Sequence, residues 1–344
     1  MSDMKEFFAL TEQLSRLCGT SGDEGDVREF IRSRLPADCT VTADSIGNLI
    51  VFRKGAREPK NRVMYAAHMD EVGFIVTDIC DDGRLKFAPV GGISPAVVFG
   101  RRVIFRNGTV GVIAAKALHH LSSDEKENQP KISDLSIDIG AQNAEEAEKY
   151  VIRGDYCYFD GEYECFGNGF IKGKALDDRA GCAVMLTLLN EELPYDAWFV
   201  FTVQEEIGTR GAVCAAYTVK PDIAVVLETT TACDIAGSED EKRVCELGRG
   251  VVVSFMDRST IYDRELYRIG RATADEIGAK NQTKTLIAGG NDSGAIHKAA
   301  GGVRTMALSV PTRYLHSPAC VMKASDVEDT LNTARAVLPK LAEL

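Results

Sequence analysis

The stretch Trp198-Phe199-Val200-Phe201-Thr202-Val203-Gln204-Glu205-Glu206-Ile207-Gly208 decides the interpretation of this chain. It opens with an unbroken run of apolar and β-branched residues, which is typical of a strand buried on both faces of a sheet. Two adjacent carboxylates, Glu205 and Glu206, follow directly. Because a buried charge loses its hydration, we expect a compensating cation beside this pair.

Working outward from that strand, helical and strand patterns alternate along most of the chain. A hairpin over residues 40–51 should turn at Gly47-Asn48. Helices are predicted over residues 3–18, 24–35, 178–192, 263–279 and 325–342, and strands over residues 62–68, 197–204, 221–228, 250–255 and 303–310. Strands separated by helices predict an α/β fold with a mixed, largely parallel sheet covered by helices on both faces.

Residues 72–165 follow a different pattern, with short alternating strands between turn signals. Asp82-Gly83 and Asn107-Gly108 are dipeptides of the hairpin type. Residues 122–130 should form an exposed loop, and residues 144–150 a short helix. We therefore expect a small β-barrel-like domain over residues 72–165, inserted into a larger domain made of residues 1–71 and 166–344.

Composition excludes several classes of partner and location. Nothing in the 344 residues resembles a membrane span or a signal peptide. The ten cysteines are scattered, which suits free thiols in a reducing cytoplasm better than a disulfide framework. A net charge of −11 argues against nucleic acid or an anionic membrane as partner.

Polar residues suited to metal binding stand at or near the predicted ends of strands, where sites form in open α/β sheets. They are His68, Asp70, Asp177, Asp178, Glu205, Glu206, Glu228 and His316. Imidazoles and carboxylates together are the donor set of zinc, cobalt or manganese.

Two such ions need a bridging carboxylate, four more ligands and a free carboxylate that deprotonates water. Five ligands are available in His68, Asp177, Glu206, Glu228 and His316, with Glu205 as the base.

Asp70 lies two residues after His68, so both side chains should share a face of the strand. Its carboxylate can then accept the second ring N–H and orient the imidazole. We count Asp70 with Glu205 as the catalytic pair. Taken singly, a strand-end histidine or a Glu-Glu pair is more often structural or simply solvated. The prediction therefore rests on their combination.

Four segments together resemble the TET (tetrahedral) dinuclear metalloaminopeptidases, a family that includes glutamyl and deblocking enzymes and members labelled cellulases. The segments are Ala67-His68-Met69-Asp70-Glu71-Val72-Gly73-Phe74, Ala175-Leu176-Asp177-Asp178-Arg179, Val203-Gln204-Glu205-Glu206-Ile207-Gly208 and Arg313-Tyr314-Leu315-His316-Ser317-Pro318. The resemblance covers nearly the whole chain. It implies a catalytic metallopeptidase domain (residues 1–71 and 166–344), a dimerisation insert (residues 72–165) and a twelve-subunit particle.

The resemblance also implies roles for individual residues. His68 and His316 would bind different ions, and Asp177 would bridge them, followed by a cis peptide to Asp178. Glu206 and Glu228 would complete the two metal shells, and Glu205 would act as general base and then as acid. Two positions depart from the family pattern. Position 228 is Glu where many members have Asp, and position 291 is Asn where threonine is expected.

The implied activity is removal of the N-terminal residue from short peptides that carry a free amine. Two divalent ions per subunit would support it, zinc or cobalt first and manganese third. The alternatives are a carboxypeptidase or deacylase of the same architecture, which Glu228 keeps open, and a non-catalytic assembly homologue. A cellulase is disfavoured, because glycosidases use two carboxylates without metals and would leave the histidines idle.

Overall fold

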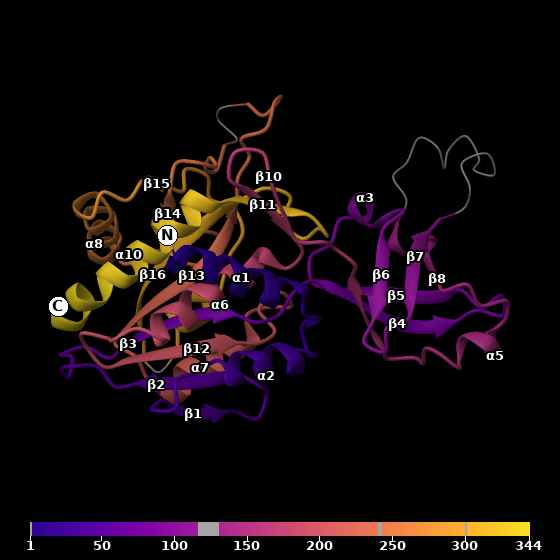
Figure 1. The fold of residues 1–344 in the computed structure, drawn as a ribbon, viewed down its shortest axis with the longest axis horizontal. Coiled ribbons are helices and arrows are strands. Elements are labelled where there is room, and N and C mark those ends of the chain that lie inside the picture. Colours follow the sequence, from indigo (N-terminus) through magenta and orange to yellow (C-terminus); the bar gives the residue numbers. More distant parts are fainter. Residues whose placement is uncertain (1, 116–130, 240–242, 300) are drawn as a thin grey trace.

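The computed structural model describes residues 2–115, 131–239, 243–299 and 301–344. In this part of the chain an α/β body adjoins a smaller β barrel, drawn at the right of Figure 1. The loop expected over residues 122–130 lies outside the described residues. No helix among those described is long and apolar enough to cross a membrane.

The α/β body contains an eight-stranded sheet with the order β1-β2-β12-β3-β13-β16-β14-β15. Its strands are β1 (Thr40–Ala43), β2 (Leu49–Arg53), β3 (Val63–His68), β12 (Ala197–Thr202), β13 (Ile223–Thr231), β14 (Val251–Val253), β15 (Asn281–Thr283) and β16 (Arg304–Thr312). The central strands β12, β3, β13 and β16 are mutually parallel, whereas β2 and β14 run antiparallel to them. The expected mixed, largely parallel sheet is confirmed.

Helices cover both faces of this sheet, because the central strands are apolar on both sides. One face packs against α1 (Ser2–Arg16), α2 (Gly25–Ser33), α6 (Leu176–Leu189), α8 (Arg264–Glu276) and α10 (Ala324–Glu343). The other packs against α7 (Arg210–Val219) and α9 (Ser293–Ile296). Successive side chains of β3 alternate between the two cores. Tyr65 joins the first core, and Met64 and Ala66 join the second.

Six strands close into a barrel in the order β4-β5-β8-β7-β6-β9. They are β4 (Gly73–Ile79), β5 (Leu85–Val90), β6 (Arg102–Phe105), β7 (Val110–Ala114), β8 (Ser136–Asp138) and β9 (Tyr156–Phe159). The short helices α3 (Pro95–Val98), η2 (Ile132–Asp134) and α5 (Ala144–Ala147) lie between strands. Asp82-Gly83 and Asn107-Gly108 stand in the β4–β5 and β6–β7 connections, as predicted. Closure leaves the barrel without an unpaired edge.

Some elements differ from the sequence-based expectation. A small sheet of β10 (Glu164–Phe166), β11 (Phe170–Gly173) and β17 (Cys320–Lys323) was not predicted, nor was α7. The strand expected to end at Glu228 continues to Thr231, because residues 229–231 keep pairing with β16. The strand expected over residues 197–204 ends at Thr202. The backbone N–H groups of the residues after Thr202 donate to side chains instead of to a strand.

Candidate metal centre

The parallel strands bring the expected metal-binding residues to one edge of the sheet. His68 ends β3 and lies opposite Thr202, the last residue of β12. Glu228 lies in β13, which pairs with β3 on its other side. Asp177 stands at the first turn of α6, and His316 follows β16. Glu206, the fifth expected ligand, follows β12. The ligands from β3, β12, β13 and β16 converge because the carboxyl ends of parallel strands share an edge, and the start of α6 brings Asp177 to the same place.

Asp177 lies between the two imidazoles. Its Oδ1 atom is 3.3 Å from Nε2 of His68, and its Oδ2 atom is 3.7 Å from Nε2 of His316. On the His316 side, Oε2 of Glu206 is 3.2 Å from the same Nε2 atom. On the His68 side, Oε1 of Glu228 is 3.5 Å from Nε2. Each imidazole thus faces one oxygen of Asp177 and one glutamate.

Two overlapping groups of potential metal donors result from this geometry. In each, the donor atoms lie within 4.8 Å of one another, and the groups are His68, Asp177 and Glu206, and His68, Asp178 and Glu228. The sequence placed Asp178 among the polar residues suited to metal binding but did not assign it as a ligand. Its side chain is fully buried, Oδ1 accepts the N–H of Gly181 at 3.0 Å, and Oδ2 has no hydrogen-bond partner. The adjacent Asp177-Asp178 pair was the only sequence signal for it.

The backbone around the site departs from ordinary conformations. Positive φ angles occur at Ala175 (52°), Gln204 (57°), Tyr314 (58°) and His316 (57°), in or beside the segments that carry the donors. The peptide between Asp177 and Asp178 is cis, as the family resemblance implied. Left-handed conformations at non-glycine residues tend to cluster at functional sites, where the surroundings hold them in place.

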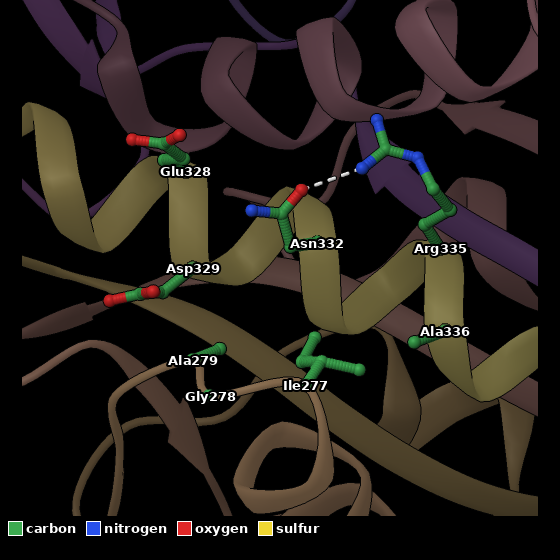
Figure 2. A pocket seen from close by; sticks show the side chains of 8 residues that line it. All are labelled: Ile277, Gly278, Ala279, Glu328, Asp329, Asn332, Arg335 and Ala336. Carbon is green, nitrogen blue, oxygen red and sulfur yellow. Dashed lines mark hydrogen bonds between the residues drawn. The ribbon is translucent and has the colours of Figure 1, made fainter.

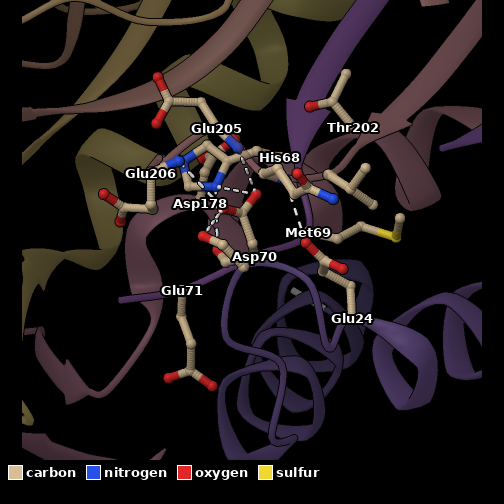
Figure 3. Close-up of polar contacts among 12 residues, drawn as sticks. Glu24, His68, Met69, Asp70, Glu71, Asp178, Thr202, Glu205 and Glu206 are labelled. Atoms are coloured by element: carbon tan, nitrogen blue, oxygen red, sulfur yellow. Dashed lines mark hydrogen bonds and ion pairs between the residues drawn. The ribbon is translucent and has the colours of Figure 1, made fainter. Parts of the chain in front are cut away.

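Asp70 supports both the histidine and the glutamate pair (Figure 3). His68 Nδ1 lies 3.0 Å from the carbonyl oxygen of Asp70 and 3.5 Å from its Oδ1. The Asp70 carboxylate also accepts the backbone N–H groups of Glu205 at 3.0 Å and Glu206 at 3.1 Å, and the Ser21 hydroxyl at 2.6 Å. The shorter ring contact is therefore to the backbone of Asp70, while its carboxylate mainly orders the turn that carries the two glutamates.

A second buried network, made of hydrogen bonds and ion pairs, fixes the segment that follows His68. The Arg179 guanidinium is fully buried and donates to the carbonyl oxygen of Met69 at 2.7 Å. Lys174 is also buried and donates to both carboxylate oxygens of Glu71, at 2.6 and 2.9 Å. These two cations neutralise the charge of Glu71. They do not pair with the carboxylates that lie nearer the imidazoles.

Glu205 and Glu206 have different surroundings although they are neighbours. Glu206 faces His316, whereas Glu205 is half-buried and belongs to neither donor group. Their carboxylates lie apart in Figure 3. Burial, with the negative charges of Glu228 and Asp292, raises the pKa of Glu205 well above its ordinary value. A raised pKa makes this carboxylate a stronger proton acceptor than an ordinary glutamate.

The donors fit a divalent cation electrostatically. Burial raises the pKa of Glu228 to about 8, and it also raises the pKa of Glu206. Although burial opposes its protonation, His316 has a pKa raised to about 9 by its contact with Glu206 and by nearby Asp177. The carboxylates therefore hold protons on themselves and on the histidine, and a bound cation would replace those protons. A cavity of about 10 Å³ beside Asp177, Glu206 and His316 has room for about one group of the size of a water molecule.

A larger hollow, of about 380 Å³, is lined by none of these residues (Figure 2). It is formed by residues 277–279, after α8, and by Glu328, Asp329, Asn332, Arg335 and Ala336 of α10. Arg335 donates to Asn332 and pairs with Glu191 at 2.6 Å. The Arg335 guanidinium is thus engaged by its neighbours, and the hollow is lined by neither a histidine nor a cysteine, so we assign it no catalytic role.

Two more buried carboxylates near the site were missed in the sequence. Asp292 accepts the hydroxyl of Thr202 at 2.5 Å, its Oδ1 has no partner, and burial raises its pKa to about 6. Glu24 accepts the backbone N–H groups of Gly22 at 2.7 Å and Gln204 at 3.1 Å. Glu24 was expected only as the first residue of the helix over 24–35, and Asp292 lies in the polar segment Gly289–Gly294, which resembles a loop near the site in the family but gave it no role. Only the folded chain reveals that both carboxylates are buried.

Comparison with known proteins agrees with this architecture. The sequence pattern of M42 glutamyl aminopeptidases matches residues 47–332. A putative aminopeptidase of Acetivibrio thermocellus is 38% identical over 95% of this chain and 97% of its own length. The solved structure of an aminopeptidase from Desulfurococcus kamchatkensis superposes with a TM-score of 0.92 at 31% identity, covering 98% of this chain and 95% of that one.

A third comparison concerns the TET1 peptidase of Pyrococcus horikoshii, which can assemble into a tetrahedron or a large octahedral shell. It superposes with a TM-score of 0.84 at 32% identity, over 97% of this chain and 98% of that one. Fold, sequence pattern and the converging histidines and carboxylates therefore agree. The chain belongs to the M42 glutamyl aminopeptidase family and is a metal-dependent aminopeptidase of the TET type.

Proposed function

We propose that this aminopeptidase holds two divalent ions per subunit and uses Glu205 to move the proton during peptide hydrolysis. The observation that carries the proposal is the position of Asp177, whose two oxygens face different imidazoles at 3.3 and 3.7 Å. His68 and Glu228 would hold one ion, and His316 and Glu206 the other, with Asp177 between them. Zinc or cobalt suits this nitrogen and oxygen set best, and manganese is the third candidate.

When bound, such ions polarise the scissile carbonyl and make water acidic enough to ionise at neutral pH. The protein's own contribution is to move the proton. Glu205 would take it from the attacking water and pass it to the leaving amine. Asp70 would fix His68 through ring contacts at 3.0 and 3.5 Å, and it would fix Glu205 through the backbone N–H that it accepts.

The proposed substrate is a short peptide with a free N-terminus. The carboxylates gathered at the site favour a positively charged ammonium group beside the reacting bond. A free-amine peptide should therefore be cleaved and its acetylated form spared. Equal cleavage of both would favour the carboxypeptidase or deacylase alternative, which the longer arm of Glu228 leaves open. Absence of both metal and turnover would favour a non-catalytic homologue.

We also propose that the chain assembles through its barrel. Residues 72–165 would form the dimerisation domain of the catalytic body of residues 1–71 and 166–344, and dimers would build a dodecamer. The shells formed by the Pyrococcus horikoshii TET1 peptidase support this proposal. Light scattering tests it, and a stable, fully active monomer would contradict it.

All ten cysteines are free, which supports a location in the reducing cytoplasm.

A further inference from the structure

The turn that carries Glu205 and Glu206 is held by side chains. Four consecutive backbone N–H groups after β12 donate to side-chain oxygens from distant parts of the chain. The pairs are Val203 to Asn48 at 3.0 Å, Gln204 to Glu24 at 3.1 Å, Glu205 to Asp70 at 3.0 Å and Glu206 to Asp70 at 3.1 Å. Position and orientation of the general base therefore depend on these acceptors as well as on the sheet.

Glu24 is a charged acceptor to which the proposed chemistry gives no role. Its side chain is 4% exposed, and it belongs to neither metal-donor group. The residue whose N–H it accepts, Gln204, has a φ of 57°, which is unfavourable for a residue with a Cβ. Such a conformation persists only where its surroundings impose it. The Glu24 contact at Gln204 is one of those constraints, immediately before the general base.

The loop of residues 20–24 is itself anchored on three sides. Ser21 donates its hydroxyl to Asp70 at 2.6 Å and its backbone N–H to the carbonyl of Glu71 at 3.3 Å. On the barrel side, Arg106 pairs with Asp23 at 2.8 Å, and Tyr158 donates its hydroxyl to the same carboxylate. Glu24 therefore acts from a fixed loop that contacts both the barrel and the metal-site turn.

We infer that Glu24 is a positioning residue for the reaction, which holds the Gln204 peptide and thereby orients the carboxylate of Glu205. This inference rests on the proposed role of Glu205. The required property is a side-chain oxygen that accepts an N–H, so glutamine can supply it and alanine cannot. Small misplacements of a reacting group cost on the order of 100-fold in rate, so even a modest shift of this turn should be measurable.

The test compares Glu24→Ala with Glu24→Gln in the full-length enzyme. Glu24→Ala should lower kcat on the order of 10- to 100-fold, with KM and metal content unchanged. Glu24→Gln should restore kcat to within about threefold of the wild type, because its amide oxygen replaces the acceptor. Hydrogen exchange of the metal-free protein gives a readout independent of catalysis. Backbone amides of residues 203–206 should exchange faster in Glu24→Ala and at the wild-type rate in Glu24→Gln.

Val27→Ala is the matched structural control. Val27 is fully buried in the helix that follows Glu24, so its truncation destabilises the same region without removing the hydrogen bond. It should lower Tm and leave kcat unchanged. The inference is overturned if Val27→Ala loses as much kcat as Glu24→Ala, if Glu24→Gln is as impaired as Glu24→Ala, or if exchange at residues 203–206 is unaltered. An active Glu205→Gln enzyme would instead refute the proposed function, whatever the exchange rates.

Discussion

The Oδ1 atom of Asp177 lies 3.3 Å from Nε2 of His68, at the junction between the start of α6 and the end of β3. Its other oxygen is directed to the second histidine of the site. Burial opposes ionisation of Asp177, but the hydrogen bond and positive charge of His68 outweigh it and hold the carboxyl pKa below its ordinary range. One carboxylate therefore serves both halves of the site.

Substituting Asp177 should disrupt both halves together. Asp177→Ala removes the group that both imidazoles face, so we expect the bound metal to fall well below one ion per subunit and activity to vanish. Glu228→Ala should affect mainly the His68 side and retain about one ion. Metal content after gel filtration checks both variants. Two tightly held ions in Asp177→Ala would contradict the bridging role.

Substituting the two adjacent glutamates by glutamine should have different effects on turnover and on metal content. Glu205→Gln keeps the shape of the side chain and removes its proton-accepting charge. Its kcat should therefore fall on the order of 100- to 10,000-fold with full metal content. Glu206→Gln should lose metal, because it weakens a donor that lies 3.2 Å from His316. Steady-state kinetics and elemental analysis of both proteins decide the matter. Normal turnover by Glu205→Gln would refute its assignment as the base.

Metal affinity should rise with pH up to about 8 to 9. In the metal-free protein, Glu228 has a pKa of about 8 and His316 of about 9, so both hold protons at neutral pH. An incoming cation must displace those protons, and affinity falls as pH falls by about tenfold per unit for each proton released. Calorimetry in buffers of different ionisation enthalpy counts the protons. Binding that releases none between pH 6 and 7.5 would contradict these protonation states.

A pH effect on stability is expected at Asp326, away from the metal site. This buried carboxylate accepts the N–H groups of Gly248 at 2.6 Å and Gly250 at 2.8 Å, and burial raises its pKa to about 6. An unfolded aspartate titrates near 4, so between roughly pH 4 and 6 the folded state binds more protons. The free energy of unfolding should therefore fall as pH rises through this window.

Asp326→Asn isolates that effect, because asparagine does not titrate. The variant should start less stable than the wild type at pH 4.5, since it retains only one of the two acceptors. The difference in the free energy of unfolding between wild type and variant should then shrink by about 2 kcal/mol on reaching pH 7. Urea unfolding of both metal-free proteins gives the comparison. A difference in the free energy of unfolding that does not change with pH would show that Asp326 ionises normally in the folded chain.

Much of this fold could be predicted from local patterns. The apolar runs that became β3 and β12 are long and uninterrupted, so their burial and parallel pairing followed from the sequence. The Asn107-Gly108 dipeptide likewise marked a barrel hairpin. The sheet of β10, β11 and β17 escaped prediction because its strands have only three or four residues each, and β17 lies about 150 positions from its partner. Such pairing depends on tertiary contacts.

The candidate ligands could be predicted because each belongs to a short segment with recognisable chemistry. Among their supporting residues, Asp70 could be predicted from its spacing to His68, but Glu24 and Asp292 could not be assigned a role. Glu24 and Asp292 stand in polar segments whose burial arises only when remote parts of the chain pack over them. The contact of His68 with the carbonyl oxygen of Asp70 also depends on how the chain turns after β3, which side-chain alternation along a strand does not describe. Sequence therefore indicated the chemistry, and folding supplied the positioning.

Anomalous X-ray diffraction from crystals grown with zinc tests the central claim most directly. The account predicts two anomalous peaks per subunit on either side of Asp177. One should lie within about 2.0–2.2 Å of donor atoms from His68 and Glu228, and the other within that distance of His316 and Glu206. Glu205 should contact neither. A single peak, or a peak with Glu205 as a direct ligand, would contradict the account.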